Sequence, residues 1–161
     1  MPKLVAVLHN IRSLHNVGSI FRTADAAGFS KIYLSGITPS PQDRLGNYRA
    51  PLAKVSLGAE KYVPWQKVKS TLALLRQLKR ASYYIVALEQ SPAAKNIFTY
   101  NLPPETYNLA LIVGHETRGL SPAILRQADA VLEIPMQGKK ESLNVSVAFG
   151  IAAYHLRKNI F

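Results

Sequence analysis

The sequence predicts an α/β domain whose mainly parallel sheet is flanked by helices, and two observations support this class. Short apolar runs without polar alternation, such as Leu4 to Leu8 and Leu109 to Val113, are typical of strands that are covered on both faces. Between these runs lie stretches whose apolar residues recur at helical spacing. Because strands and helices alternate along the chain, we expect ligands at the carboxyl ends of the strands.

The first part of the chain predicts a strand, a helix and a second strand. Leu4 to Leu8 is the first strand, and a polar loop follows it. The apolar face of the helix consists of Val17, Ile20, Phe21, Ala24 and Ala27. Asn16 is placed to cap this helix and Gly28 to end it. Lys31 to Leu34 is the second strand, and Gly36 to Gly46 is a long loop.

The middle of the chain predicts a short helix, a brief strand, a longer helix and another strand. These elements span Ala50 to Leu57, Tyr62 to Val63, Val68 to Lys79 and Tyr83 to Leu88. The longer helix is amphipathic, with Leu72, Leu75 and Leu78 on its apolar face. The strand from Leu109 to Val113 then leads into a loop bracketed by glycines, Gly114 to Gly119. After this loop, Ser121 and Pro122 suit the cap and first residue of a short helix that ends near residue 127.

The last predicted helix is apolar nearly all round. A strand from Val131 to Ile134 is stopped by Pro135, a polar loop follows at 137–141, and the helix begins near Val145. One apolar stripe contains Val145, Ala148, Phe149, Ala152 and Leu156, and the opposite stripe contains Val147, Ile151 and Tyr154. The sheet can cover only one stripe. A second subunit, or other parts of the same chain, must cover the other, and the pattern leaves both alternatives open.

Composition favours a polyanionic partner and an intracellular location. Lysine and arginine number 20 against 9 acidic residues, giving a formal charge of +11, although a basic surface that serves only solubility is an alternative. The chain has no cysteine, which excludes disulfides and thiolate nucleophiles and fits a reducing compartment. The apolar run at the N-terminus is too short for a signal peptide or a membrane span. We therefore expect a cytoplasmic protein, organised as one domain over residues 1–161, without membrane contact.

Several common kinds of site lack their sequence patterns. No G-x-G-x-x-G follows the first strand, and the loop at 114–119 lacks the Lys-Ser or Lys-Thr of a phosphate loop. The four histidines have neither the spacing nor the acidic neighbours of a metal site, so no metal is expected. No Ser-His-acid triad is recognisable from spacing. Three polar loops remain, at 10–16, 114–119 and 135–144, and their Asn, Arg, Glu and Ser side chains can bind and orient a ligand.

Three segments in these loops form a recognisable series. They are Asn16 to Thr23, Ile112 to Ser121, and Ile134 to Met136 together with Ser142 to Ser146. In this order and at these separations, they resemble the three motifs of the SpoU family, which are RNA ribose 2′-O-methyltransferases of the SPOUT class. The resemblance covers nearly the whole chain, so we expect no separate RNA-binding extension.

The resemblance implies a SPOUT-type fold, a cofactor and a set of site residues. The C-terminal part is expected to form a trefoil knot that binds S-adenosylmethionine, and a homodimer is expected to carry its active sites at the interface. The implied cofactor contacts are Leu88, Gly114, Ile134, Ser142 and Leu143. The implied catalytic set is Asn16, Arg22, Glu116, Ser142 and Asn144. The plainer alternatives are helix caps for Asn16 and Asn144, a turn residue for Ser142, a loop acid for Glu116 and a surface arginine for Arg22.

The implied reaction is transfer of a methyl group to a ribose hydroxyl of RNA, with S-adenosylhomocysteine as the product. A compact chain resembles the tRNA-modifying branch more than the ribosomal one, so tRNA is expected as substrate and rRNA is the alternative. Arg22 is expected to anchor the target phosphate and to stabilise the developing alkoxide. That phosphate is expected to help remove the proton, because the guanidinium of arginine stays protonated near neutral pH and so cannot act as the base. A non-catalytic RNA-binding or ribosome-assembly protein and a base-methylating SPOUT enzyme stay as alternatives.

Overall fold

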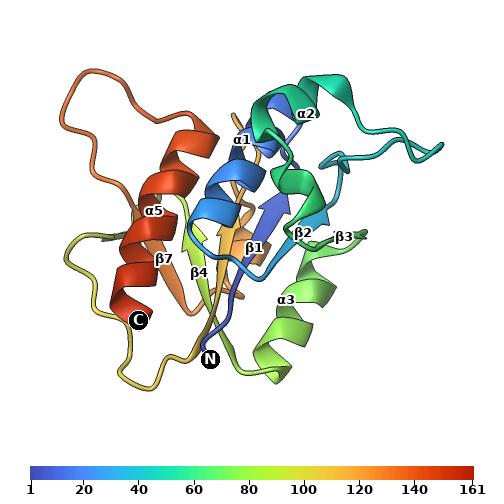
Figure 1. Ribbon diagram of the computed structural model, residues 1–161. Coiled ribbons are helices and arrows are strands. Elements are labelled where there is room, and N and C mark those ends of the chain that lie inside the picture. Colours follow the sequence, from blue (N-terminus) through green and yellow to red (C-terminus); the bar gives the residue numbers. More distant parts are fainter.

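The computed structural model describes residues 1–161 and contains a fully parallel sheet of seven strands (Figure 1). The strands are β1 Leu4–His9, β2 Lys31–Ser35, β3 Trp65–Val68, β4 Tyr83–Leu88, β5 Lys95–Asn96, β6 Asn108–Val113 and β7 Ala130–Glu133. Their order across the sheet is β3-β2-β1-β6-β4-β7-β5. The predicted class, a mainly parallel sheet flanked by helices, is confirmed.

Helices cover both faces of the sheet, as Figure 1 shows. They are α1 Leu14–Ala26, α2 Ala50–Ser56, α3 Thr71–Arg80, α4 Pro122–Leu125 and α5 Val145–Ile160, with a short 3-10 turn, η1, at Ala59–Lys61. Helices α1, α2 and α5 pack on one face, and α3 and α4 pack on the other. In β1, Leu4, Ala6 and Leu8 point to the first face while Val5 and Val7 point to the second, and all five are buried. Burial on both faces explains the continuous apolar run of this strand.

The strand order places a crevice at the carboxyl edge of the sheet. Neighbouring strands β1 and β6 lie at its centre. From β1 the chain builds outward through β2 and β3, whereas β4 and β7 lie on the other side of β6. In parallel sheets, ligands bind outside the carboxyl ends of the strands where the direction of building reverses. The three polar loops that the sequence singles out follow β1, β6 and β7, so all three lie on this edge.

The structure corrects two predicted elements in the middle of the chain. The strand predicted at 62–63 is wrong, because these residues follow the turn η1 and the strand is β3, in which Val68 pairs with Ser35. The helix predicted from Val68 instead begins at Thr71. Ser70 caps it by accepting a hydrogen bond of 3.2 Å from the backbone N–H of Ala73. A four-residue edge strand is too short for its pattern to be separated from the helix that follows.

The cap of α1 also differs from the prediction. Ser13, not Asn16, is the N-cap, and its hydroxyl accepts a hydrogen bond of 3.1 Å from the backbone N–H of Asn16. Asn16 belongs to the first turn of α1 and does not cap it, so its side chain is available for other contacts. At the other end, Gly28 has a φ of +74°, which glycine tolerates best, and the helix ends there as predicted. The two-residue strand β5 has no sequence signal.

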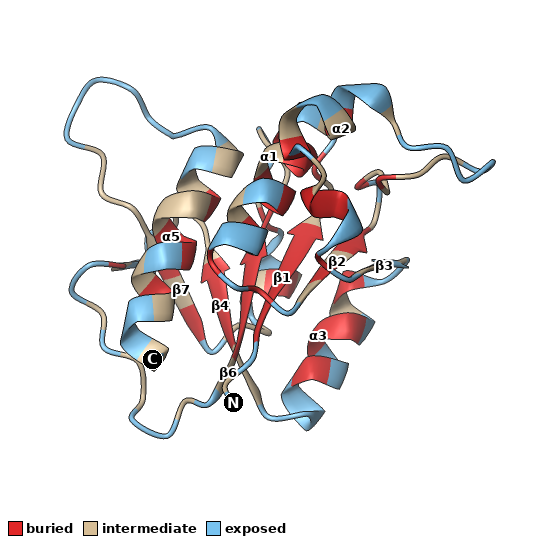
Figure 2. Ribbon diagram, in the orientation of Figure 1, coloured by how far each residue is buried: buried red, intermediate tan, exposed pale blue.

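Helix α5 has one buried stripe and one exposed stripe (Figure 2). Phe149 and Ala152 are fully buried, whereas Val147 and Tyr154 are 51% and 53% exposed. Ile151 in the same stripe is partly buried, so the chain covers the second stripe only in part, and the alternative of a helix enclosed within one chain is wrong. No helix in the structure is long and apolar enough to cross a membrane. The trefoil knot stays a prediction, because strand order and register do not define how the chain is threaded.

Candidate active site

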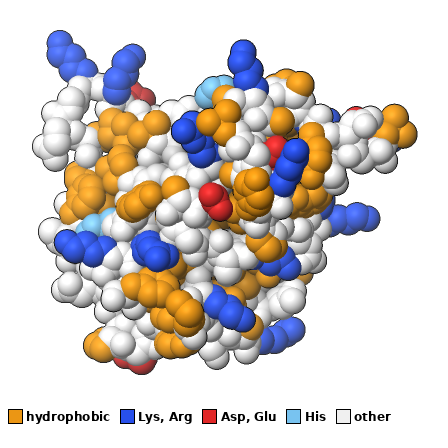
Figure 3. All heavy atoms as spheres, viewed as in Figure 1, with side chains coloured by type: hydrophobic (Ala, Val, Ile, Leu, Met, Phe, Trp, Pro, Cys, Tyr) orange, Lys and Arg blue, Asp and Glu red, His pale blue; other side chains and the backbone are white.

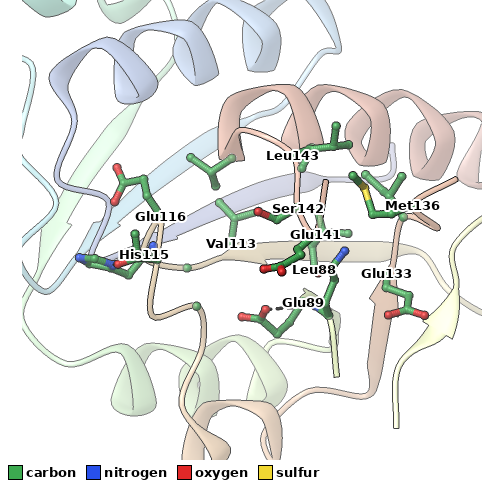
Figure 4. A pocket seen from close by; sticks show the side chains of 17 residues that line it. Leu88, Glu89, Val113, His115, Glu116, Glu133, Met136, Glu141, Ser142 and Leu143 are labelled. Atoms are coloured by element: carbon green, nitrogen blue, oxygen red, sulfur yellow. Dashed lines mark hydrogen bonds between the residues drawn. The ribbon is translucent and has the colours of Figure 1, made fainter. Parts of the chain in front are cut away.

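A pocket of about 300 Å³, called the main pocket here, opens at the carboxyl edge of the sheet (Figure 4). Its lining comes from three stretches of the chain, near residues 88–90, 113–119 and 133–148. These stretches follow β4, β6 and β7 and include the start of α5. The volume lies in the range of pockets that bind small organic ligands, about 300–1,000 Å³. Two of the three predicted polar loops therefore meet at one cavity.

Apolar side chains form much of the wall of the main pocket. They are Leu88, Val113, Ile134, Met136, Leu143, Val145 and Ala148. Leu143 is 38% exposed, which is unusual for a leucine beside a helix start and leaves its surface free to contact a ligand. Such walls offer an apolar surface to a flat apolar group of a ligand.

The loop from Gly114 to Gly119 is tight, and the atoms around its two glycines leave no room for a Cβ. A Cβ on Gly114 would lie 2.7 Å from backbone atoms of Gly119. Gly119 itself has a φ of +64°, and its backbone N–H donates a hydrogen bond of 2.9 Å to the carbonyl of His115. The loop therefore brings main-chain atoms, rather than bulky side chains, to the edge of the pocket.

Glu89 fastens this loop from the neighbouring strand. One carboxylate oxygen accepts a hydrogen bond of 2.6 Å from the backbone N–H of Leu120, and the other accepts one of 3.0 Å from the N–H of Gln90. A Cβ on Gly119 would lie 2.0 Å from the Glu89 carboxylate, so the two residues depend on one another. Charge-assisted hydrogen bonds of this kind are stronger than neutral ones and hold the loop in one conformation.

The main pocket is acidic although the protein is strongly basic. Four of the nine acidic residues of the chain line it, namely Glu89, Glu116, Glu133 and Glu141. Figure 4 shows their side chains around the cavity. The single ion pair of the structure lies elsewhere, between Lys79 and Asp129 at 3.5 Å. The carboxylates of the pocket have no cationic partner, so a positively charged ligand would be attracted to this cavity.

A chain of side-chain hydrogen bonds joins the three polar loops. The Asn144 amide N–H donates to the Oδ1 of Asn16 at 3.1 Å, and the Asn16 amide N–H donates to Glu116 at 3.4 Å. The Glu116 carboxylate also accepts backbone hydrogen bonds from Ser13 at 3.1 Å and Arg12 at 3.3 Å. Asn144 is at the same time the N-cap of α5, which is the plainer alternative that the sequence left open for this residue. Residues 100 or more positions apart are thus held in one network.

The network determines the ionisation of Glu116. Burial raises the pKa of this carboxyl, but the hydrogen bonds that it accepts from the backbone of Ser13 and Arg12, from its own N–H and from the Asn16 amide outweigh burial. The pKa of Glu116 is therefore lower than its ordinary value. Because its lone pairs are engaged by donors, Glu116 is suited to orienting the loops rather than to accepting a proton.

The predicted site residues fall into two groups. Leu88, Gly114, Glu116, Ile134, Ser142 and Leu143 line the main pocket. Asn16 and Asn144 lie behind it in the hydrogen-bond network. Arg22 is exposed on α1, six residues beyond Asn16 and so about 9 Å further along the helix axis. Within one copy of the chain, Arg22 is not among the residues that line the main pocket.

Sequence reasoning missed much of the acidic lining. Glu89 directly follows β4, and Glu133 is the last residue of β7. Acidic residues at the carboxyl ends of predicted strands are therefore the sequence signal that could have identified these two. Glu141 lies in the loop before α5, away from any strand end, and has no such sequence signal. No group of three or more His, Cys, Asp or Glu side chains is placed to hold a metal ion. The apolar walls and the four glutamates together can bind a ligand with a flat apolar part and a positive charge, and hold it in a fixed orientation.

Comparison with known proteins agrees with this geometry. A family model described as the SpoU rRNA Methylase family matches residues 3–154. The 23S rRNA (guanosine-2'-O-)-methyltransferase RlmB of Neisseria meningitidis serogroup B is 31% identical over 157 residues, which are 98% of this chain and 59% of that protein. The chain thus spans about three-fifths of the length of the curated relatives that it matches.

Two solved structures share the fold over its full extent. The AdoMet-bound rRNA methyltransferase from Sinorhizobium meliloti has a TM-score of 0.85 and 27% identity, covering 99% of this chain and 57% of that one. The A. aeolicus TrmH/SpoU tRNA modifying enzyme has a TM-score of 0.81 and 30% identity, covering 99% of this chain and 76% of that one. Both matches include the edge of the sheet that carries the main pocket.

Proposed function

The chain belongs to the SpoU rRNA Methylase family, and from this premise we propose that it is an S-adenosylmethionine-dependent RNA ribose 2′-O-methyltransferase. The observation that carries the proposal is the main pocket, which combines apolar walls with unpaired carboxylates. S-adenosylmethionine has a flat adenine and a net positive charge, because its sulfonium and amino groups carry two positive charges against one carboxylate. The residues present therefore suit this cofactor in shape and charge.

Each part of the pocket has a role in this proposal. Leu88, Ile134 and Leu143 hold the adenine, while Glu133 and Glu141 lie in the field of the cofactor's positive charges. When bound, the cofactor supplies an electrophilic methyl group: the ribose oxygen forms the new O–C bond with its lone pair, the C–S pair passes to sulfur, and the hydroxyl proton leaves. The contribution of the chain is to align hydroxyl and methyl, because in-line orientation supplies much of such an acceleration.

Arg22 is the proposed catalytic residue, and in this proposal it acts across a dimer. Its guanidinium holds the phosphate at the target nucleotide and stabilises the developing alkoxide, and that phosphate helps to take up the proton. Within one chain Arg22 is exposed and does not line the main pocket, and in this proposal a second copy supplies it or completes the site around it.

The exposed apolar stripe of α5 supports the homodimer. Val147 and Tyr154 lie uncovered on this helix, and α1, which carries Arg22, packs beside it (Figure 1). Figure 3 shows apolar side chains and scattered arginines and lysines on this side of the molecule. Pairing of two such faces would bury the stripe and bring one copy's α1 toward the other's pocket.

We propose tRNA as the substrate and keep rRNA as the alternative. The likeness to the A. aeolicus TrmH/SpoU tRNA modifying enzyme, at 30% identity, supports tRNA. The likeness to the Neisseria meningitidis 23S rRNA methyltransferase RlmB, at 31% identity, supports the alternative. Comparison of tRNA and rRNA from a deletion strain by mass spectrometry of ribose-methylated nucleosides decides between the two.

The proposed role of Arg22 is tested by Arg22→Ala. We expect the variant to bind S-adenosylmethionine in calorimetry with the affinity of the unchanged protein, and to transfer no tritiated methyl group to RNA. Arg76→Ala is the matched control, because Arg76 is also an exposed helix arginine but lies on the opposite face of the sheet. Loss of cofactor binding in Arg22→Ala, or full transfer activity, contradicts the assignment.

A further inference from the structure

A second cavity of about 420 Å³ adjoins the main pocket on the other side of the Gly114–Gly119 loop. It is called the basic hollow here. Its lining consists of His9, Asn10, Arg12, Ile37, His115, Arg118, Gly119 and Ser121. His115 and Gly119 also line the main pocket, so the two cavities share a wall. The hollow lies beyond the carboxyl ends of β1, β2 and β6, and the strand order reverses between β1 and β6.

The charges of the two cavities are segregated. The basic hollow contains two exposed arginines, Arg12 and Arg118, and no acidic residue. The main pocket contains four glutamates and no lysine or arginine. Neighbouring cavities of opposite sign fit two ligands of opposite charge that meet at the loop between them. A cation is favoured on one side, and an anion on the other.

Buried polar residues hold the floor of the basic hollow in place. Three of the six buried polar residues of the chain, Ser35, Thr38 and Thr71, lie beneath it. Thr71 donates to Ser35 at 2.8 Å, and Ser35 donates to the carbonyl of Leu8 at 3.3 Å. Thr38 donates to the same carbonyl at 2.7 Å and accepts from the N–H of Ile11 at 3.0 Å. Since buried polar groups destabilise a fold unless they are satisfied, this network marks a preorganised surface.

The hydrogen bonds also fix the forms of the two histidines. Because the Thr71 hydroxyl donates to Ser35, the 2.7 Å contact between His9 and Thr71 places a proton on His9 Nδ1. His115 Nδ1 accepts from the backbone N–H groups of Thr117 and Arg118, each at 3.1 Å, so its proton lies on Nε2. His115 therefore offers an N–H donor, and its other nitrogen holds the backbone from which Arg118 projects.

Burial lowers the pKa of His9, and the neighbouring His115 lowers it further. His9 is therefore a neutral part of the floor at pH 7 and adds no charge to the hollow. The positive charge of the hollow belongs to Arg12 and Arg118, which are the two side chains that can grip an anion in bidentate fashion.

We propose that the basic hollow binds a backbone phosphate of the RNA strand next to the nucleotide that is methylated, with Arg12 and Arg118 as its ligands. This inference rests on the proposed function, because it takes RNA as the polyanion. It is separate from the role of Arg22, which lies on α1 and outside the hollow, whereas Arg12 and Arg118 lie in loops. A phosphate held here would fix the register of the strand against the main pocket without reading its sequence.

The test compares two double variants that remove the same charge. Arg12→Gln with Arg118→Gln alters the hollow, and Arg76→Gln with Arg80→Gln alters exposed arginines of α3. The probe is unfractionated tRNA, and its dissociation constant is measured over a series of salt concentrations. We expect the first pair to weaken binding about tenfold and to lower the slope of log K against log salt by about 1, as loss of one phosphate contact requires. We expect the second pair to change binding less than about twofold.

Two results overturn the proposal: an unchanged salt slope in the Arg12 and Arg118 variant, or equal weakening in both variants. Calorimetry with S-adenosylmethionine separates this failure from failure of the proposed function, because neither pair of arginines touches the main pocket. If the unchanged protein binds no cofactor while the hollow variant loses tRNA, the methyltransferase assignment fails and the phosphate site stands. If the cofactor binds and the slope does not change, the phosphate site fails and the assignment stands.

Discussion

The substitution Asn144→Asp tests the network that joins the three loops. Asparagine and aspartate are equally good helix N-caps, and the negative charge would interact favourably with the helix dipole by about 0.3–1 kcal/mol. The cap alone therefore predicts a neutral or stabilising change. The side chain of Asn144, however, also donates to Oδ1 of Asn16 at 3.1 Å, and aspartate has no proton to donate there at pH 7.

Asn16 cannot adapt by turning its amide over. Its N–H already donates to Glu116, so a turned amide would place its oxygen against that carboxylate. Asn16 is only 7% exposed, and an unsatisfied buried acceptor costs about 1–3 kcal/mol. Set against the favourable dipole term, the expected net loss for Asn144→Asp is about 1–2 kcal/mol in the free energy of unfolding at pH 7.

Urea unfolding at pH 7 measures this loss, and Ser70→Asp is the matched control. Ser70 caps α3 through a single hydrogen bond to Ala73 and has no second partner, so its replacement should be neutral or slightly stabilising. Lowering the pH below about 4 protonates an ordinary aspartate and restores a donor, which should reduce the deficit of Asn144→Asp. If Asn144→Asp is as stable as the unchanged protein at pH 7, the contact with Asn16 does not exist and the reasoning is refuted.

Three further predictions follow from the site. Because the pKa of His9 is lowered in the folded protein, His9 takes up a proton below about pH 6.5 more readily in the unfolded chain than in the folded one. The free energy of unfolding should therefore decrease from pH 7.5 to pH 5.5, and it should decrease by less in His9→Asn. Urea unfolding at both pH values measures this difference. Gly114→Ala should lower the free energy of unfolding by about 1–3 kcal/mol and remove most cofactor binding, because its Cβ would lie 2.7 Å from the Gly119 backbone. Thermal unfolding and calorimetry measure the two effects, and a stable variant that binds the cofactor normally contradicts the prediction. Glu133→Gln with Glu141→Gln should weaken S-adenosylmethionine binding about tenfold and S-adenosylhomocysteine binding less, since the product lacks the sulfonium charge; equal weakening of both ligands in calorimetry contradicts an action of these carboxylates on the sulfonium.

Periodicity in the sequence predicts most of the fold because most elements are long or fully buried. The runs Leu4 to Leu8 and Leu109 to Val113 are covered on both faces, so their apolar character is unmixed. The prediction fails where an element is short and at the edge of the sheet. In β3, only Trp65 and Val68 are partly buried, and this pattern cannot be told from the first turn of a helix.

The site is predictable in part, for a different reason. Resemblance to a family identifies Gly114, Ser142 and Leu143, which line the main pocket, but it does not report charge that accumulates from several loops. The acidic lining and the neighbouring basic hollow depend on tertiary structure. Asn16 illustrates the same limit: its sequence position suits a cap, and only the fold brings it between Asn144 and Glu116.

The most direct test of the central claim locates the transferred methyl group. The protein is incubated with tRNA and with S-adenosylmethionine whose methyl group carries three deuterium atoms, and the RNA is digested to nucleosides for mass spectrometry. The account predicts that the label appears on a ribose 2′-oxygen, and that it disappears in Arg22→Ala. Label on a base, or no label on either tRNA or rRNA from a protein that binds the cofactor, contradicts the account.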